Sequence, residues 1–132
     1  MAFPRKIVKI RNTRQNDRKK AERAGRRAEW ICALWLRLCG YRILAMRYRC
    51  PVGEIDIIAK KGTLIAAIEV KNRGNLHDAL HALRPKQQQR IAHALASFAA
   101  RINHQGDLRF DIMAISNIFR IHHLKNAWMA RN

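Results

Sequence analysis

Three charged side chains stand out in the middle of the chain because their neighbours are almost all apolar. Asp56 lies in "EIDIIA", whereas Glu69 and Lys71 lie in "LIAAIEVK", which gives the spacing D-x(12)-E-x-K. An ionised carboxylate in an apolar environment is costly unless it is paired or binds a cation. Mg²⁺ accepts one or two carboxylates together with waters and phosphate oxygens. The pattern therefore points to a metal site of the kind that cleaves phosphodiesters, with the lysine stabilising charge on the phosphate.

A purely structural interpretation of the same residues stays open at this stage. Glu69 can form a salt bridge with Lys71 or Arg73 without any metal. A tripeptide of an acid, any residue and lysine is expected about once by chance in a chain of this length and composition. The spacing alone does not decide between a salt bridge and a metal site.

The overall charge identifies the class of partner that the chain attracts. Lysine and arginine number 27 against nine aspartates and glutamates, and the formal net charge is +18. Such a charge attracts polyanions, nucleic acid first and acidic membranes second. The chain has no apolar run of membrane-spanning length and no stretch typical of a signal peptide. We expect a cytoplasmic protein that binds nucleic acid and does not enter a membrane.

Composition also limits the fold and the chemistry of the cysteines. An apolar fraction of 48% is typical of a globular protein, and 132 residues suit one hydrophobic core. The three cysteines have no paired C-x-x-C spacing, so neither a disulfide framework nor a zinc site is predicted. The six histidines likewise show no convincing ligand spacing, and we expect surface or pairing roles for them.

The first 24 residues differ from the rest of the chain. They are strongly basic and show little apolar periodicity. We predict a basic N-terminal arm over residues 1–24, leading into a helix, and one domain over residues 25–132. Three interpretations of the arm stay open: a solvated tail, a segment that contacts nucleic acid, and a mitochondrial transit peptide.

Helical spacing of apolar residues predicts a helix over residues 25–39, which Gly40 ends. Glu29 shares the apolar face of this helix with Cys32 and Leu36, so its carboxylate points toward the core. A second helix is predicted to start at Pro85 and to bury Ile91 and the residues that follow it at helical spacing. Gln87 lies one turn before Ile91 on that same face.

Runs rich in β-branched residues predict five strands, over residues 41–50, 54–59, 64–71, 108–115 and 119–124. The second and third form a hairpin, with Gly62 in the left-handed turn position. Strict alternation places Asp56 with Glu54 and Ile58, and Glu69 with Lys71. If these two strands pair across the turn, Asp56 and Glu69 are expected on the same side of the sheet near its end. Residues 75–85 are expected to be irregular, and residues 125–132 to form a short helix or an irregular cap.

Several segments, taken in order, resemble one known family. The chain resembles the YraN family of uncharacterised bacterial proteins, which belongs to the restriction-endonuclease-like, or PD-(D/E)XK, nuclease superfamily and is similar to Holliday-junction resolvases. The matching segments are "GRRAEWICALWLRLCGYRIL", "GEIDIIA", "IEVKNR", "PKQQQRIAHA", "RFDIMAI" and "HHLKNAW". The sequence departs from the family at Arg47, where asparagine is common, and at Ala67, where a bulkier residue is usual.

The resemblance implies an α/β fold, a restriction-endonuclease-like mixed β-sheet flanked by helices with an αβββαβ core. It also implies roles for particular residues. Asp56 and Glu69 are similar to the pair that binds Mg²⁺ or Mn²⁺, and Lys71 to the catalytic lysine. Glu29 resembles the helix glutamate that completes the site in resolvase-like members, and Gln87 a polar residue that the following helix contributes.

The expected function is metal-dependent hydrolysis of phosphodiester bonds in DNA, with branched DNA as one candidate substrate and DNA favoured over RNA. Arg26, Arg27, Arg73 and Lys86 flank the predicted site and are candidates for phosphate contacts, although solvated charge is the safer interpretation of any single one. The alternatives are a protein of the same fold that binds nucleic acid without cutting it, and an assembly factor that contacts RNA or ribosomes. A homodimer is expected by analogy with resolvases. Asp111 is expected to pair with Arg109 or another cation at a strand end, with a role in the site as the lesser alternative.

Overall fold

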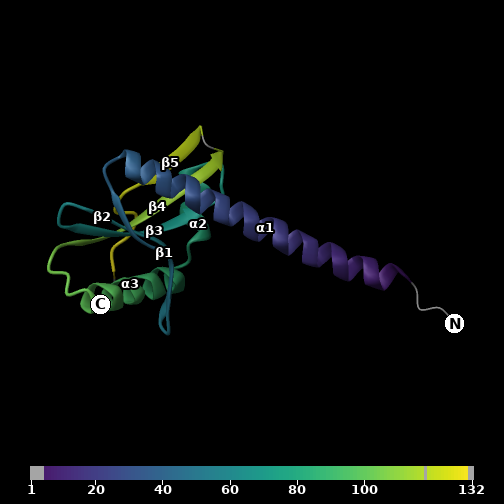
Figure 1. Cartoon of the computed structure of the whole chain (residues 1–132), viewed down its shortest axis with the longest axis horizontal. Helices are drawn as coiled ribbons and strands as arrows, with labels where there is room; N and C mark the ends of the chain where they lie inside the picture. Colours follow the sequence, from purple (N-terminus) through teal and green to yellow (C-terminus); the bar gives the residue numbers. More distant parts are fainter. Residues whose placement is uncertain (1–4, 118, 131–132) are drawn as a thin grey trace.

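The computed structural model describes residues 5–117 and 119–130, with side-chain surroundings from residue 13 onward. The first four residues of the predicted arm and the last two of the predicted tail lie outside the described residues. The helices and strands, in chain order, are α1 (Arg5–Leu38), β1 (Arg42–Cys50), β2 (Gly53–Lys61), β3 (Leu64–Lys71), α2 (Leu76–Ala82), α3 (Pro85–Arg101), β4 (Leu108–Asn117) and β5 (Arg120–Leu124) (Figure 1).

The strands form one mixed sheet in the order β1-β2-β3-β4-β5. Three neighbouring pairs are antiparallel, and β3 pairs with β4 in parallel because α2 and α3 provide the crossover between them. The predicted fold class is confirmed: the domain is a mixed α/β structure whose sheet is flanked by helices, consistent with the restriction-endonuclease-like fold. The tight turn of the hairpin is also confirmed, since Gly62 has a φ of 61°.

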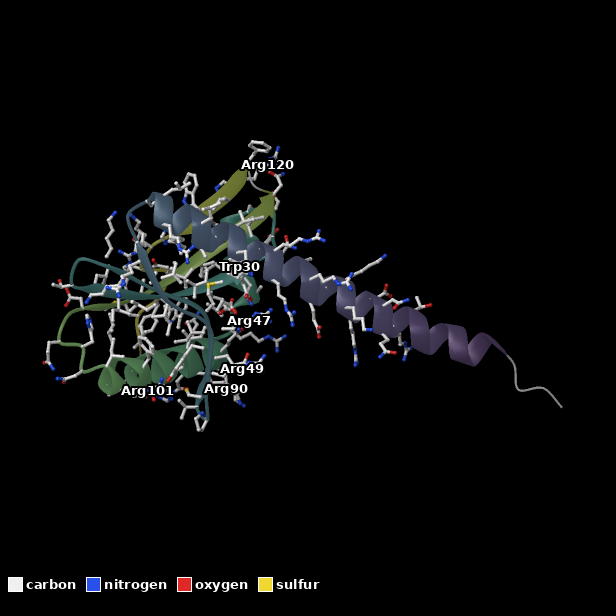
Figure 2. The ribbon with its side chains drawn as sticks, in the orientation of Figure 1. Trp30, Arg47, Arg49, Arg90, Arg101 and Arg120 are labelled. Carbon is white, nitrogen blue, oxygen red and sulfur yellow. The ribbon has the colours of Figure 1, made fainter. Side chains whose placement is uncertain are left out.

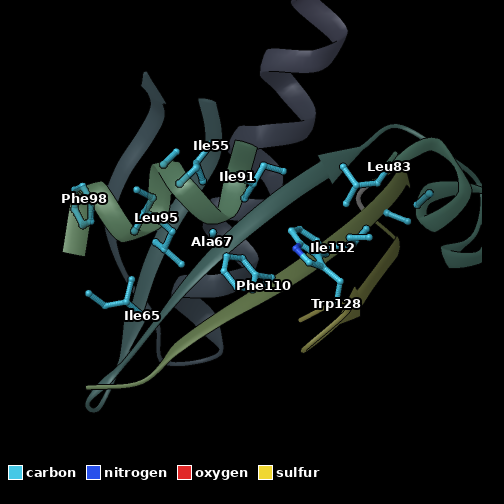
Figure 3. Packing of buried hydrophobic residues seen from close by; sticks show 14 residues of the cluster. Ile55, Ile65, Ala67, Leu83, Ile91, Leu95, Phe98, Phe110, Ile112 and Trp128 are labelled. Carbon is cyan, nitrogen blue, oxygen red and sulfur yellow. The ribbon is translucent and has the colours of Figure 1, made fainter. Parts of the chain in front are cut away.

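Helices cover both faces of the sheet, and each face has its own apolar core. On one face, α3 packs against β2, β3 and β4 through a cluster that includes Ile58, Ile91 and Ile112 (Figure 3). On the other face, the second half of α1 packs through Cys32 and Leu36 against the opposite side of the same strands. The central strands β3 and β4 are therefore apolar along most of their length, as expected of a parallel pair that is covered on both faces.

The first helix is longer than the sequence pattern predicted. It begins at Arg5 rather than near Gly25, so the prediction of its start was wrong. Residues between Arg14 and Ala24 are mostly strong helix formers, but they have no core to bury against and so show no apolar period. The first part of α1 projects away from the sheet (Figure 1). The boundary at residues 24 and 25 stays a prediction, because α1 crosses it without a break.

Two further segments differ from the expectations or refine them. Residues 75–85 are not irregular throughout, because α2 occupies Leu76–Ala82 and Asn75 caps it by accepting a hydrogen bond from the Asp78 N–H at 2.8 Å. A seven-residue helix is too short to show a clear period. Residues 127–130 form an irregular cap in which Trp128 is buried against Phe110. Within the described residues, no helix is both long enough and apolar enough to span a membrane.

The packing of α1 predicts the effect of a matched pair of substitutions. Leu36 is fully buried against the sheet, whereas Leu34 on the same helix is 57% exposed. Leu36→Ala is expected to lower the free energy of unfolding by about 2 to 5 kcal/mol, and Leu34→Ala by less than about 1 kcal/mol. Urea unfolding followed by circular dichroism measures both. Equal losses would contradict the packing of α1 against the sheet described above.

Candidate active site

The two central carboxylates lie where β2 and β3 separate. Pairing between these strands extends from the hairpin turn to Ile57 and Ile68. One residue further, a side chain takes the place of the backbone hydrogen bond between the strands. The Asp56 Oδ2 accepts a hydrogen bond from the Val70 N–H at 2.9 Å. Glu69 directly precedes Val70 in β3, the strand opposite Asp56. The fork between the two strands therefore brings Asp56 and Glu69 together, as the predicted hairpin led us to expect.

The regular alternation of β2 breaks at the same position. Ile55 and Ile58 both contact the core on the α3 face, while Ile57 contacts the core on the α1 face. Asp56 lies opposite Arg47 of β1, which has a left-handed φ of 52°. The expectation that Asp56 shares a face with Ile58 was therefore wrong, because the local distortion of both strands turns Asp56 toward α1.

Glu29 approaches the fork from α1. Its side chain is buried among apolar neighbours, as predicted, and its Oε2 accepts a hydrogen bond from Arg47 Nε at 2.8 Å. Glu29, Arg47 and Asp56 line a shared hollow of about 180 Å³. Burial raises the pKa of the neighbouring Cys32 thiol to about 12, and the charges of Asp56 and Glu29 add to that rise. Two acidic groups, one on α1 and one on β2, therefore meet at this hollow.

Glu69 is held from the α3 face of the sheet, whereas Asp56 turns toward α1, so the expectation that both carboxylates lie on the same side was wrong. Its Oε1 accepts a hydrogen bond from Gln87 Nε2 of α3 at 3.0 Å and lies 3.2 Å from Lys71 Nζ. Lys71 is two residues further along β3, so its side chain leaves the strand on the same side as Glu69. Gln87 thereby fixes the carboxylate and Lys71 supplies the nearest positive charge.

The electrostatics of the fork favour an added cation. Burial raises the pKa of the Glu69 carboxyl to about 8, and the charge of Asp56 raises it further, although Lys71 opposes the rise. Burial likewise raises the pKa of Asp56, with the charge of Glu29 adding to the effect and the hydrogen bond from Val70 opposing it. A bound cation would relieve both the desolvation and the repulsion between these groups.

The chemistry of the donors restricts the kind of metal. In the part of the chain that the structure describes, no three or more histidine, cysteine, aspartate or glutamate side chains converge as a ligand set. Asp56 and Glu69 supply oxygen donors alone. This set fits Mg²⁺ or Mn²⁺, which take carboxylates and complete their shell with water or phosphate oxygens, and it does not fit a structural zinc site.

The basic residues that were predicted to contact phosphate lie on several elements. Arg26 and Arg27 are exposed on α1 shortly before Glu29, Arg73 is exposed in the loop after β3, and Lys86 is exposed at the start of α3. Sequence reasoning missed Arg49, Arg84 and Arg90, and it noted Arg47 only as a departure from the family. The register of β1 against β2 places Arg47 and Arg49 beside the site. That register could not be read from the sequence, although their alternate spacing in a strand was visible.

Asp111 belongs to a separate buried network. Arg109 holds its two oxygens at 2.8 and 2.7 Å, and His123 Nε2 and the Asn126 N–H add contacts at 2.8 and 3.0 Å. Although burial raises the pKa of Asp111, the hydrogen bonds from His123 and Arg109 hold it below its ordinary value. The predicted pairing with Arg109 is confirmed, and a fully paired carboxylate of this kind ties β4 to β5 and to the C-terminal cap.

Comparison with known sequences identifies the family. Residues 28–115 match the model of the uncharacterised protein family UPF0102, a range that contains Glu29, Asp56, Glu69, Lys71 and Gln87. The chain belongs to this family. The resemblance to YraN proteins is thereby confirmed, because they are the same family. The matched range leaves out most of the projecting part of α1.

Three relatives, each named a UPF0102 protein, illustrate the similarity. The relative from Caulobacter vibrioides is 43% identical over 117 residues, which cover 87% of this chain and 94% of the relative. That from Parvibaculum lavamentivorans is 44% identical over 110 residues, covering 82% and 83%. That from Agrobacterium fabrum is 51% identical over 102 residues, covering 76% and 84%. The family description names no reaction, so the activity has to be argued from the site.

The raised pKa of Glu69 predicts how stability depends on pH. Between its ordinary value of 4.5 and about 8, the folded protein keeps a proton that the unfolded chain has lost. The free energy of unfolding therefore falls as pH rises through this window. Glu69→Gln removes the effect. The free energy of unfolding of the variant, taken relative to that of the wild type, should therefore rise by about 2 kcal/mol on going from pH 5 to pH 8.5.

Urea unfolding in the presence of EDTA at both pH values measures this gain. Glu54→Gln is the matched control, because the Glu54 side chain is 68% exposed and pairs only across the surface with Arg49. The control should leave the difference between the two pH values unchanged. Parallel curves for the wild type and Glu69→Gln would show that Glu69 is ionised throughout this range.

Proposed function

We propose that this protein is a metal-dependent endonuclease that hydrolyses phosphodiester bonds in DNA. The observation that carries the proposal is the pair of carboxylates at the fork of β2 and β3, with Glu69 buried, Asp56 half-buried and a lysine 3.2 Å from Glu69. Two carboxylates that repel each other in a desolvated site need a cation, and a lysine beside them suits chemistry on a phosphate.

Asp56 and Glu69 are the residues that would hold Mg²⁺ or Mn²⁺. When bound, such an ion supplies a water of lowered pKa and offsets negative charge on the scissile phosphate. Gln87 keeps Glu69 oriented through its hydrogen bond to Oε1, and the Val70 N–H does the same for Asp56. Both carboxylates are thus fixed by neighbours that do not compete for all of their oxygen lone pairs.

Lys71 and Glu29 complete the proposed chemistry. The Lys71 ammonium can donate to a phosphate oxygen or to the attacking water while it stays within reach of Glu69. Glu29 can accept a hydrogen bond from a water in the hollow that it shares with Asp56. Lys71 and Gln87 therefore act on the α3 side of the fork, and Glu29 acts on the α1 side.

The charge distribution supports a polyanionic substrate. The formal charge of +18 is spread over exposed residues that include Arg26, Arg27 and Arg73, and the projecting part of α1 adds further basic side chains. Three further points rest on the resemblance to resolvases: the preference for DNA over RNA, branched DNA as a candidate substrate, and a homodimeric state. They are part of the same proposal.

A second candidate function is nucleic-acid binding without cleavage. The observation that favours it is that two of the acids pair with cations of the protein itself, since Arg47 contacts Glu29 and Lys71 contacts Glu69. A protein that had lost the reaction could keep the fold through these two ion pairs. The two functions differ in the experiment that follows.

Cleavage assays with Asp56→Asn test the proposal. Wild-type protein with Mg²⁺ or Mn²⁺ is expected to cut at least one of three labelled DNAs: a duplex, a fork or a four-way junction. Asp56→Asn removes a charged metal ligand and should slow cleavage roughly a hundredfold or more. Asp107→Asn, at an exposed acid before β4, is the control and should cut like the wild type.

DNA binding in EDTA completes the test. Asp56→Asn should bind as tightly as the wild type or more tightly, because the substitution removes negative charge near the phosphate. Cleavage by Asp56→Asn at the wild-type rate would contradict the assigned site. Wild-type binding with no cleavage of any of the three DNAs would favour the second candidate function.

A further inference from the structure

A hollow of about 660 Å³ lies beside the candidate site, between the turn from β1 to β2 and the first turns of α3. We call it the α3 groove, and its walls include Gly53 and Glu54 on one side and Arg84, Lys86, Gln87 and Arg90 on the other. Gly53 keeps the two walls close, because a Cβ there would lie 2.6 Å from the carbonyl oxygen of Arg90. The groove is therefore built by close packing of two elements.

The groove is strongly basic. Arg84, Lys86 and Arg90 are exposed on its α3 wall, and no carboxylate among the described residues forms an ion pair with any of them. The acid on the facing wall, Glu54, lies 3.3 Å from Arg49 and is partly neutralised by it. Three cations thus face one hollow with no ion-pair partner among the described residues, and an anionic ligand would supply the missing counter-charge.

The arrangement of these cations weakens the free helix. Lys86 and Arg90 are four residues apart on α3, a spacing at which like charges repel by a few tenths of a kcal/mol. Lys86 also lies in the first turn, where a positive charge opposes the helix dipole and where α3 has no acidic residue. A helix that served stability alone would carry acids at these positions, so the charges are better explained by a ligand.

The groove leads directly to the carboxylates. Gln87 lies between Lys86 and Arg90 on α3, lines the groove, and donates its Nε2 hydrogen bond to Glu69 Oε1 at 3.0 Å. Glu54 lines both this groove and the smaller hollow that contains Glu29 and Asp56. In Figure 2, Arg47, Arg49 and Arg90 follow one edge of the domain, while Arg120 lies at its far end.

We propose that the α3 groove binds the phosphodiester backbone of the nucleic-acid strand next to the phosphate at the carboxylate pair. Arg84, Lys86 and Arg90 contact successive phosphates, and Gln87 marks the boundary between the groove and the reacting centre. The identity of the reacting centre rests on the proposed function, but the groove itself is a binding site that acts without metal. It determines on which side of Glu69 the strand lies.

The test compares two triple variants that remove the same charge. The groove variant carries Arg84→Gln, Lys86→Gln and Arg90→Gln. The control variant carries Arg42→Gln, Arg120→Gln and Lys125→Gln, at exposed positions away from the groove. Fluorescence anisotropy with a short labelled DNA duplex in EDTA, repeated over a range of salt concentrations, gives the dissociation constant and its salt dependence for each protein.

The slope of log affinity against log salt counts released counterions, at about 0.9 per phosphate contact on duplex DNA. The groove variant should lower the magnitude of this slope by about 2 to 3 and weaken binding by at least about tenfold at 0.1 M salt. The control variant should lower it by less than about 1. The melting temperature of the groove variant should equal or exceed that of the wild type, because the repulsion between Lys86 and Arg90 is removed.

Equal losses of slope and affinity in the two variants would overturn the proposal, since net charge alone would then explain binding. Because EDTA prevents cleavage, the result does not depend on the proposed endonuclease activity. A selective loss in the groove variant together with wild-type protein that never cuts DNA would support the groove and reject the enzyme. Cleavage by the wild type, together with equal binding losses in the groove and control variants, would support the enzyme and reject the groove.

Discussion

The structure depends on one constraint: two carboxylates must stay close together at a desolvated fork in the sheet. Glu69 is buried and Asp56 is half-buried although acids are scarce in this chain, and desolvation raises the pKa of both. Each surrounding element offsets part of the free-energy cost of desolvating these carboxylates. The Val70 N–H stabilises one carboxylate, and Gln87 and Lys71 stabilise the other. What they leave uncompensated is the mutual repulsion, which a divalent cation would remove.

The same constraint explains why both faces of the sheet contribute. The α1 helix packs its apolar stripe on one face and thereby brings a third acid, Glu29, to the fork. There Arg47, whose backbone is in the left-handed region, donates a hydrogen bond to Glu29. On the other face, the core under α3 fixes the helix that carries Gln87. Basic groups then border an acidic centre, an arrangement that would attract a polyanion and that suits the proposed metal between protein and phosphate.

Sequence reasoning reached the parts of this structure that depend on local patterns. The hairpin with Gly62, the burial of Glu29 on a helical stripe and the position of Gln87 on α3 all follow from periodicity and turn chemistry. It could not reach features set by tertiary packing. The break in alternation at Asp56 depends on the register of β1. The α3 groove depends on how closely Gly53 of β2 approaches α3. Residues 13–23 of the projecting part of α1 are exposed, so they leave no apolar period to detect.

The central claim is that Asp56 and Glu69 together form a divalent-metal site, and calorimetric titration tests it most directly. Mg²⁺ and Mn²⁺ would be titrated at pH 8 into the wild type, into the double variant Asp56→Asn/Glu69→Gln and into the control Asp17→Asn/Asp107→Asn, which removes two exposed acids away from the fork. The account predicts saturable binding by the wild type and the control, and none by the Asp56 and Glu69 variant. Identical titrations for all three proteins, whether each binds or none does, would contradict it.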